Sequence, residues 1–436
     1  MSTVEITPAA PAGAAWRREV IGGITTFLTM SYIIVVNPAI LSTPGTGLPA
    51  SGVLTATVML AGAMTLLMGL YARLPFAVAP GMGLNAFFTF HVILGRHVPW
   101  PTALGLVTWA GVVFLLVSVT PLRVAIARAV PHHLRLGASA GIGLLLSFIG
   151  LKAAGLVVAH PVTLVTAGSL GKPALLFGLG LLFTLFLWLR GNPLALLGGI
   201  VVTTLVGALL GEVRAPAALV SLPDLSLVGR ADLLGALRLG YLPILLAIVL
   251  TDLFDSLSTF VGVAHATGLV DERGEPRQLG RALIVDALAT LCAGLVGTSA
   301  GTAYIESAAG IRAGGRTGLV AVVCALCFVP FLFLGPLAAL VPPAATAPAL
   351  VLVGVSMFMS GVAAGGPRER IEEALPSYFT LLLIPLTSSI AQGILAGFVL
   401  HVVAFTLAGR RRELSATMWA LAGVAVLALA VEQGTR

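Results

Sequence analysis

The sequence predicts an all-α polytopic membrane protein with about 14 transmembrane segments, arranged as two inverted seven-span repeats. Three observations lead to this fold class. The 436 residues are 58% hydrophobic and 9% charged, and the mean hydropathy is +1.06, far outside the range of a soluble domain. The apolar runs are long and continuous, which excludes the alternating pattern of a barrel. The 51 glycines and 26 prolines suit helices that pack closely and break at defined points.

The spans are located as apolar runs of about 16–22 residues that are bounded by charge, proline or glycine. In the first half they fall near 20–40, 53–72, 81–93, 101–120, 137–155, 173–189 and 193–211. In the second half they fall near 241–268, 281–296, 300–312, 316–341, 347–363, 375–390 and 391–409. Because seven is odd, the second repeat crosses the membrane in the opposite sense to the first.

The basic residues set the orientation. If the tail 1–19 is cytoplasmic, most of the 24 Lys and Arg residues fall in cytoplasmic loops, as expected of a multi-pass protein of the plasma membrane, here a bacterial inner membrane. The net charge of +7 then reflects topology and indicates no nucleic-acid partner. The tail has no apolar core like that of a signal peptide.

Two segments of the chain lie outside the paired spans. The stretch 212–240 is the longest polar interruption, and we interpret it as an external connector between the repeats. The end of the chain, 410–436, begins with a basic turn and contains an apolar run near 414–431. This run is either a fifteenth span or an interfacial helix, and the sequence does not decide between them.

Two spans are interrupted by glycine and small polar residues at similar positions in the two halves. They read PGMGLNAFFTF at 80–90 and GTSAGTAYIESAAG at 297–310. Paired broken spans near the bilayer midplane mark a binding site, because free half-helix ends supply backbone donors and acceptors for a polar solute. We expect the second segment to run extended and then to start a short helix. The pairing therefore indicates a transporter.

Four carboxylates fall within predicted spans: Asp252, Asp255, Asp286 and Glu306. Each costs about 2.5–3.5 kcal/mol at the centre of a membrane helix, so each needs a partner or a polar cavity. Asp252 and Asp255 share one helix face, because they are three residues apart. Asp286 stands alone near the cytoplasmic end of its span, which favours a role in helix packing.

The residue types around the broken segments suit a flat heteroaromatic solute with ring N–H and carbonyl groups. Carboxylates accept from N–H, and the Asn85 amide both donates and accepts. Aromatic side chains for stacking are Phe87, Phe88, Phe254 and Tyr304. Buried carboxylates are also natural proton carriers, since a low dielectric disfavours their charged form. Coupling to Na⁺ would use the same oxygens, so H⁺ and Na⁺ both remain open.

Other classes fit less well. An inorganic-anion site would favour a basic residue in the broken segments, and neither segment contains one. A membrane-embedded enzyme would need histidines or a third metal ligand at helical spacing, as in HExxH, and we find none. The three cysteines lie inside apolar runs, so neither a disulfide nor a zinc site is indicated. We expect no cofactor, no metal and no catalytic residue.

Several long motifs, in order along nearly the whole chain, resemble those of the AzgA-type hypoxanthine/guanine/adenine permeases, within the nucleobase cation symporter and nucleobase-ascorbate transporter superfamily. They are GGITTFLTMSYIIVVNPAIL at 22–41, GMGLNAFFTF at 81–90, DLFDSLSTFVGVA at 252–264, GTSAGTAYIESAAGIRAGGRTGL at 297–319, ATAPALVLVGVSM at 345–357 and ALPSYFTLLLIPLTSSIAQGILAGF at 374–398. The resemblance implies proton-coupled purine import by an elevator mechanism, with xanthine, urate or a pyrimidine such as uracil as the alternative solute.

The resemblance also implies a core domain that slides against a gate domain. The core would comprise 20–120 and 241–341, and the gate 137–211 and 347–409. Membrane lipid surrounds such proteins, and related proteins suggest a homodimer.

Carried over residue by residue, the family's site falls on Asn85, on Asp252 with Asp255, and on Glu306. Asp252 and Glu306 would accept from purine N–H groups and Asn85 would orient the ring. Asp255, together with Glu306, would couple the proton. Neighbouring positions complete the expected substrate site: Ala86, Phe87, Phe254 and Thr302.

The chain departs from the family pattern beside Glu306. Where the family usually reads GTSTVTTYIES, this chain has Ala300, Gly301 and Ala303. Where DLFDTLGT is common, it has Ser256 and Ser258. The loss of hydroxyls and bulk changes the pocket next to the carboxylate, which bears on which purine is preferred rather than on the class of solute.

Overall fold

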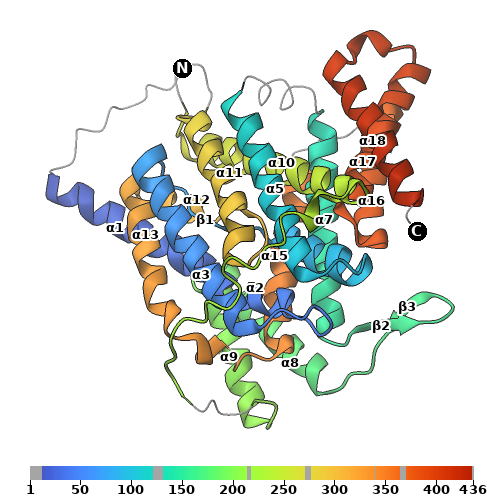
Figure 1. The fold of residues 1–436 in the computed structure, drawn as a ribbon. Helices are drawn as coiled ribbons and strands as arrows, with labels where there is room; N and C mark the ends of the chain where they lie inside the picture. Colours follow the sequence, from blue (N-terminus) through green and yellow to red (C-terminus); the bar gives the residue numbers. More distant parts are fainter. Residues whose placement is uncertain are drawn as a thin grey trace.

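Apolar helices form most of the molecule (Figure 1). The computed structural model describes residues 12–120, 131–213, 218–270, 276–338, 340–363 and 370–434. Residues 1–11 of the predicted N-terminal tail lie outside this range. The first-half elements are α1 Ala12–Met30, α2 Ile33–Leu41, α3 Ala50–Leu67, η1 Met68–Ala72, β1 Val78–Pro80, α4 Met82–Ala86, η2 Phe87–Gly95, α5 Trp100–Val119, α7 His132–Ala153, β2 Val157–His160, β3 Leu164–Ala167, α8 Lys172–Leu189 and α9 Ala195–Leu209.

The second half begins after the connector. Its elements are η3 Gly235–Leu237, η4 Leu239–Tyr241, α10 Leu242–Thr267, α11 Leu279–Val296, β4 Gly301–Ala303, α12 Ser307–Arg312, α13 Gly318–Phe328, η5 Val329–Leu332, α14 Gly335–Ala338, α15 Pro343–Ala363, α16 Ile371–Thr387, α17 Ile390–Leu407, η6 Arg411–Glu413 and α18 Ala416–Gly434. Both η1 and η2 are π-helical, and the remaining η elements are short 3-10 turns.

The chain is a multi-pass membrane protein. Within the described residues, nine helical stretches are long and apolar enough to cross a bilayer. Shorter apolar helices cover Met82–Gly95, Ala195–Leu209, Gly318–Leu332 and Ala416–Ala430. The number of spans, about 14, and the inverted repeat stay predictions.

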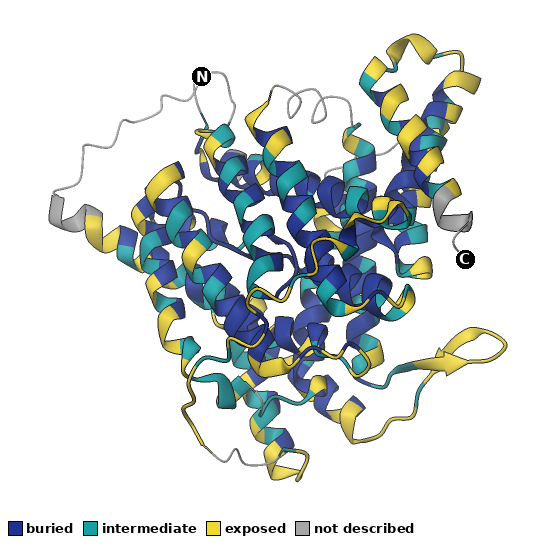
Figure 2. Ribbon diagram, viewed as in Figure 1, coloured by how far each residue is buried: buried dark blue, intermediate teal, exposed yellow. Residues whose placement is uncertain are grey.

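Helices distant in sequence form the most extensive contacts. α7 packs on α15, α5 packs on α11, and α16 packs on α7. The consecutive helices α16 and α17 also pack on each other. Small residues allow the closest approach: a Cβ on Gly143 would meet the carbonyl oxygen of Gly354, and the reverse holds for a Cβ on Gly354. Figure 2 shows buried residues where helices meet and exposed residues around the periphery.

The C-terminal helix α18 packs against α17 and α10. One of its faces is buried through Met418, Ala422 and Ala425. The opposite face exposes apolar side chains, including Trp419 and Leu427. A helix that is apolar on all sides is suited to a hydrocarbon environment.

The connector 212–240 and the β2–β3 hairpin differ in how closely they pack against the helices. The connector packs onto the helices over its described part: Leu227 is buried, the Gly229 amide donates to the Leu295 carbonyl at 2.8 Å, and the Asp232 amide donates to Pro101 at 2.8 Å. By contrast, the antiparallel β2–β3 hairpin extends away from the helices (Figure 1) and is exposed along almost its whole length.

The Gly143–Gly354 contact predicts that Gly354→Ala lowers stability, because the new Cβ would overlap the Gly143 carbonyl on α7. Overpacking of this kind costs about 1–3 kcal/mol. The matched control is Gly423→Ala, where nothing lies within 4 Å of the added Cβ. The thermal midpoint of the detergent-solubilised protein should fall for Gly354→Ala alone, and equal midpoints would contradict the packing described.

Candidate functional site

The two interrupted segments meet as a pair of short antiparallel strands. Val78 of β1 lies opposite Ala303 of β4, and Pro80 lies opposite Gly301. The pairing is framed by two backbone hydrogen bonds, from Gly81 to Ala300 at 2.9 Å and from Tyr304 to Ala77 at 3.0 Å. All six strand residues are buried. The predicted break in the second segment, extended and then helical, is confirmed.

Side-chain hydroxyl groups form hydrogen bonds with strand amide and carbonyl groups that the β1–β4 pairing leaves without a partner. Thr65 Oγ1 lies 2.9 Å from the Val78 amide and 3.0 Å from the Val78 carbonyl oxygen. Ser307 Oγ accepts from the Ala77 amide at 3.0 Å, and the Tyr304 hydroxyl donates to the Pro80 carbonyl at 2.5 Å. Such partners are needed because membrane hydrocarbon offers no hydrogen bonds to exposed backbone.

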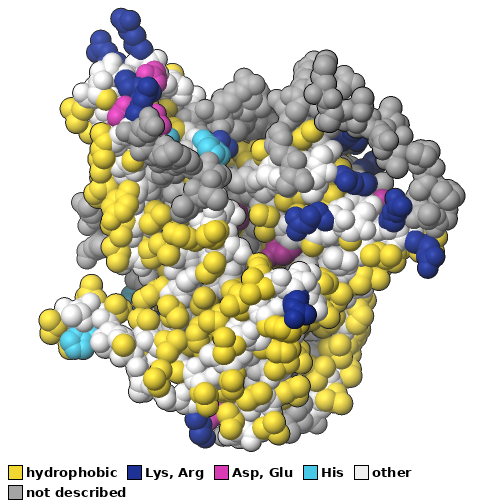
Figure 3. Space-filling model, turned by 180° about the vertical axis from the view of Figure 1, so that it is seen from behind, with side chains coloured by type: hydrophobic (Ala, Val, Ile, Leu, Met, Phe, Trp, Pro, Cys, Tyr) yellow, Lys and Arg dark blue, Asp and Glu magenta, His cyan; other side chains and the backbone are white. Residues whose placement is uncertain are grey.

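Two of the predicted carboxylates are partly exposed. Asp255 lies midway along α10, and Glu306 precedes α12 directly after the strand pair. The Tyr32 hydroxyl, at the junction of α1 and α2, donates to Glu306 Oε1 at 2.8 Å. Figure 3 shows acidic surface within a recess of the molecule, among hydrophobic side chains. An ionisable group open to water inside a membrane protein marks a solute or ion pathway.

The other two carboxylates, Asp252 and Asp286, are fully buried. Thr290 donates to Asp252 Oδ2, and Ser256 donates to Asp286 Oδ2. The sequence placed Asp286 alone, whereas the structure joins it to the helix of Asp252. Among the described residues there is no group of three or more His, Cys, Asp or Glu side chains that could hold a metal ion.

The remaining predicted site residues are buried. Asn85 and Ala86 on α4 have no exposed surface, and the Ser299 hydroxyl donates to Asn85 Oδ1. The Phe87 ring stacks on His91 with centroids 5.0 Å apart. Phe254 meets Phe398 of α17 edge-on at 6.4 Å. Thr302 lies in β4 and is also buried.

Sequence reasoning missed several polar partners of the site. Tyr32 and Thr290 were not singled out, although a hydroxyl close to a helix break or to a buried carboxylate is such a signal. Asn37 of α2 was missed as well: its amide donates to Thr57 Oγ1 at 2.7 Å and to Thr298 Oγ1 at 2.9 Å. It therefore ties α2 and α3 to the second broken segment.

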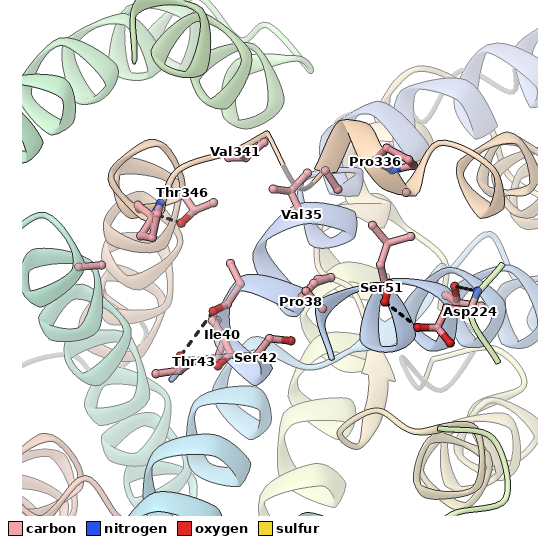
Figure 4. A pocket seen from close by; sticks show the side chains of 18 of the residues that line it. Val35, Pro38, Ile40, Ser42, Thr43, Ser51, Asp224, Pro336, Val341 and Thr346 are labelled. Carbon is pink, nitrogen blue, oxygen red and sulfur yellow. Dashed lines mark hydrogen bonds between the residues drawn. The ribbon is translucent and has the colours of Figure 1, made fainter. Parts of the chain in front are cut away.

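The structure also contains a cavity that none of the four span carboxylates lines. A cavity of about 660 Å³ is bounded mainly by α2 and α3 on one side and by α7 and α15 on the other, and its walls are mostly apolar (Figure 4). At one end, Ser51 donates to Asp224 Oδ2 at 2.6 Å. The hydrogen bond from Ser51, followed by that from the Ser226 amide, lowers the pKa of Asp224.

Known proteins are similar to this chain along most of its length. The family described as "Permease family" matches residues 17–409. A putative permease of Methanocaldococcus jannaschii is 43% identical over 419 residues, which cover 95% of each chain. The adenine permease AdeP of Escherichia coli K12 is 41% identical over 405 residues, 92% of this chain and 90% of AdeP. The guanine/hypoxanthine permease PbuG of Bacillus subtilis is 37% identical over 429 residues, 95% of this chain and 96% of PbuG.

Solved structures share the architecture. The transmembrane domain of the cyanobacterial bicarbonate transporter BicA superposes with a TM-score of 0.66 at 20% identity and covers 88% of this chain and 97% of its own. SLC26A9 superposes with a TM-score of 0.65 at 10% identity, and the match covers 92% of this chain and 67% of the SLC26A9 chain. At these identities the similarity concerns the fold alone.

The Asn37 bridge predicts that Asn37→Leu destabilises the protein by about 1–3 kcal/mol, because Thr57 and Thr298 lose a buried donor. The control is Asn192→Ala on an exposed turn, where the Leu194 amide that loses its bond to Asn192 Oδ1 is open to water. Thermal unfolding in detergent should separate the two variants. An Asn37→Leu protein as stable as the control would show that the bridge contributes nothing.

Proposed function

Because the chain belongs to the permease family, we propose that it imports purine nucleobases, namely adenine, guanine or hypoxanthine, by proton symport. The family consists of transporters, so the chain is not an enzyme. The purine assignment rests on relatives such as AdeP and PbuG. The coupling assignment rests on the partly exposed carboxylates inside the membrane.

The observation that carries the proposal is the partial exposure of Asp255 and Glu306, two membrane carboxylates whose charges interact. The Tyr32 hydroxyl, at the junction of two helices, holds Glu306. Two partly exposed carboxylates can accept from two purine N–H groups, and either can take up a proton from water. We therefore assign substrate binding and proton exchange to Asp255 and Glu306.

Asp252 takes a different place from the one expected from the sequence. Its side chain has no exposed surface, so it does not reach a solute in this conformation. In our proposal it belongs to a buried layer behind Asp255. Asn85, Ala86 and Phe87 are buried too, and they contact the purine only after the packing above them opens.

The proposed transport cycle uses two parts of the molecule, the 660 Å³ cavity and the partly exposed region of α10 at Asp255. On the predicted topology, the 660 Å³ cavity between α2, α3 and α7, α15 lies on the external side. The exposed face of α10 continues from Asp255 to Ser258 and Gly262, toward the cytoplasmic end. The predicted core and gate domains would move against each other to open one side at a time, as an elevator does. The purine would be loaded through the external cavity and released past Asp255.

Uptake of radiolabelled adenine, guanine and hypoxanthine, by cells that lack their own purine carriers, tests this function. Accumulation that a protonophore abolishes, in buffer without Na⁺, is the expected result. Accumulation that requires Na⁺ and resists the protonophore would show that Na⁺, and not H⁺, is the coupling ion. No accumulation of any purine, with the protein confirmed in the membrane, would remove the substrate assignment.

Glu306→Gln should reduce purine uptake at least about tenfold, because an amide loses both the charge and the proton-binding oxygen. Asp255→Asn is expected to act in the same direction. Glu212→Gln, at an external ion pair with Lys172, is the matched control and should leave uptake intact. Normal uptake by Glu306→Gln would contradict the assigned role.

Ala39→Trp should block uptake, because Ala39 is an exposed, small lining residue of the 660 Å³ cavity and the indole would fill part of it. The control is Leu182→Trp, which adds the same ring to an exposed face of α8. Initial rates at equal expression compare the two. Equal rates would show that the purine does not pass this cavity.

A further inference from the structure

Asp252 and Asp286 are held by a reciprocal arrangement of two helices. Asp252 on α10 accepts from Thr290 on α11, and Asp286 on α11 accepts from Ser256 on α10. In each helix the carboxylate and the hydroxyl are four residues apart, on one face. All four side chains are fully buried.

Both hydroxyls also reach strand β4. Thr290 Oγ1 lies 2.9 Å from the Gly301 carbonyl oxygen, and Ser256 Oγ lies 2.7 Å from Thr302 Oγ1. Gly301 lies opposite Pro80 in the register, and the flanking bonds run from Gly81 to Ala300 and from Tyr304 to Ala77. Gly301 is therefore in a non-hydrogen-bonded pair, so its carbonyl points away from β1. Thr290 is the donor that faces it.

A hydroxyl has one proton to donate, so each of these two has two arrangements. While Asp252 is ionised, Thr290 donates to it and the Gly301 carbonyl has no donor. Once Asp252 is protonated, its O–H can donate to Thr290 Oγ1, and Thr290 donates to Gly301. In the same way, protonation of Asp286 reverses Ser256, which then donates to Thr302.

The Asp252–Asp286 pair needs at least one proton, because no cation in the described part of the chain balances the negative charge of the two carboxylates. Among the described residues, no Lys or Arg forms a salt bridge with either carboxylate. Asp252 Oδ1 and Asp286 Oδ1 are both buried without a hydrogen-bond partner. Two adjacent ionised carboxylates without a cation are strongly unfavourable away from water, so the pair holds at least one proton when it is enclosed.

We propose that the Asp252–Asp286 pair is the proton-holding site, and that strand β4 senses its protonation through reversal of the Thr290 and Ser256 hydrogen bonds. β4 leads through Tyr304 to Glu306, so a proton on the pair adds a hydrogen bond to the strand that positions the substrate carboxylate. This deepens the proposed function and rests on it.

Few other charged groups act on this pair. Asp255 interacts electrostatically with both carboxylates and, being partly exposed, can exchange protons with the opening. Neighbouring α5, α3 and β4 carry no Asp, Glu, His, Lys or Arg. Among the described side chains, the other elements in contact with α10 or α11 contribute Tyr71 on η1, Tyr241 on η4, Arg312 on α12 and His401 on α17.

Thr290→Val tests the proposal, because it keeps the shape of the side chain and both carboxylates but removes the hydroxyl between Asp252 and Gly301. Wild-type protein in Na⁺-free liposomes should bind purine about tenfold more tightly at pH 6 than at pH 8, the size expected for one added hydrogen bond. Thr290→Val should flatten this pH profile, and Thr290→Ser should restore it. Thr204→Val on α9, whose hydroxyl bonds only its own helix, is the matched control.

Infrared difference spectra between pH 6 and pH 8 supply a readout that does not depend on any substrate. The wild-type spectrum should contain a C=O stretch of a neutral carboxylic acid that is lost in Asp252→Asn and in Asp286→Asn and shifts in Thr290→Val, while any band from Asp255 or Glu306 stays. An unchanged band in both Asn variants, or an unchanged pH profile in Thr290→Val, would overturn the inference while leaving purine symport standing. A carboxylic-acid band that behaves as expected in protein that binds no purine would support the proton site and overturn the purine assignment alone.

Discussion

Backbone that leaves the helical conformation inside a membrane has to find its hydrogen bonds within the protein, and the central part of this structure follows from that constraint. The two interrupted spans meet it by pairing with each other as β1 and β4. Hydroxyls of Thr65 and Ser307 complete the pairing. The positions of Asn85 and Glu306 follow, since each lies on or beside the short helix that leaves its strand.

The same constraint explains the small residues and the many hydroxyls around the strands. A Cβ on Gly301 would press on Ala289, so glycine permits β4 to lie directly against α11. Close packing leaves room for short polar side chains, and Ser or Thr can bond backbone and carboxylate alike. The departures seen in the sequence, Ala300, Gly301 and Ala303, therefore lie where the strand packs.

The sequence was sufficient for the membrane class and for the break in the second segment, because composition and local spacing carry those features. The choice of site carboxylates stays a prediction. It did not reveal the β1–β4 pairing, which joins residues more than 200 positions apart. The sequence also could not show which of Asp252 and Asp255 is buried and which is partly exposed. Residues three apart differ by about 60° around a helix, which is enough to bury one and expose the other, and only the neighbouring helix determines which. Asp286 illustrates the same limit, since its partner Ser256 lies on another helix.

The β2–β3 hairpin contributes nothing to the packed interior and projects freely beside it. Chain that makes few contacts tolerates inserted residues well. An epitope or a fluorophore placed between His160 and Leu164 would sit on the segment that the sequence assigns to the gate. Paired with a second label on the opposite moving part, it would give an external reference from which the motion of single molecules can be followed.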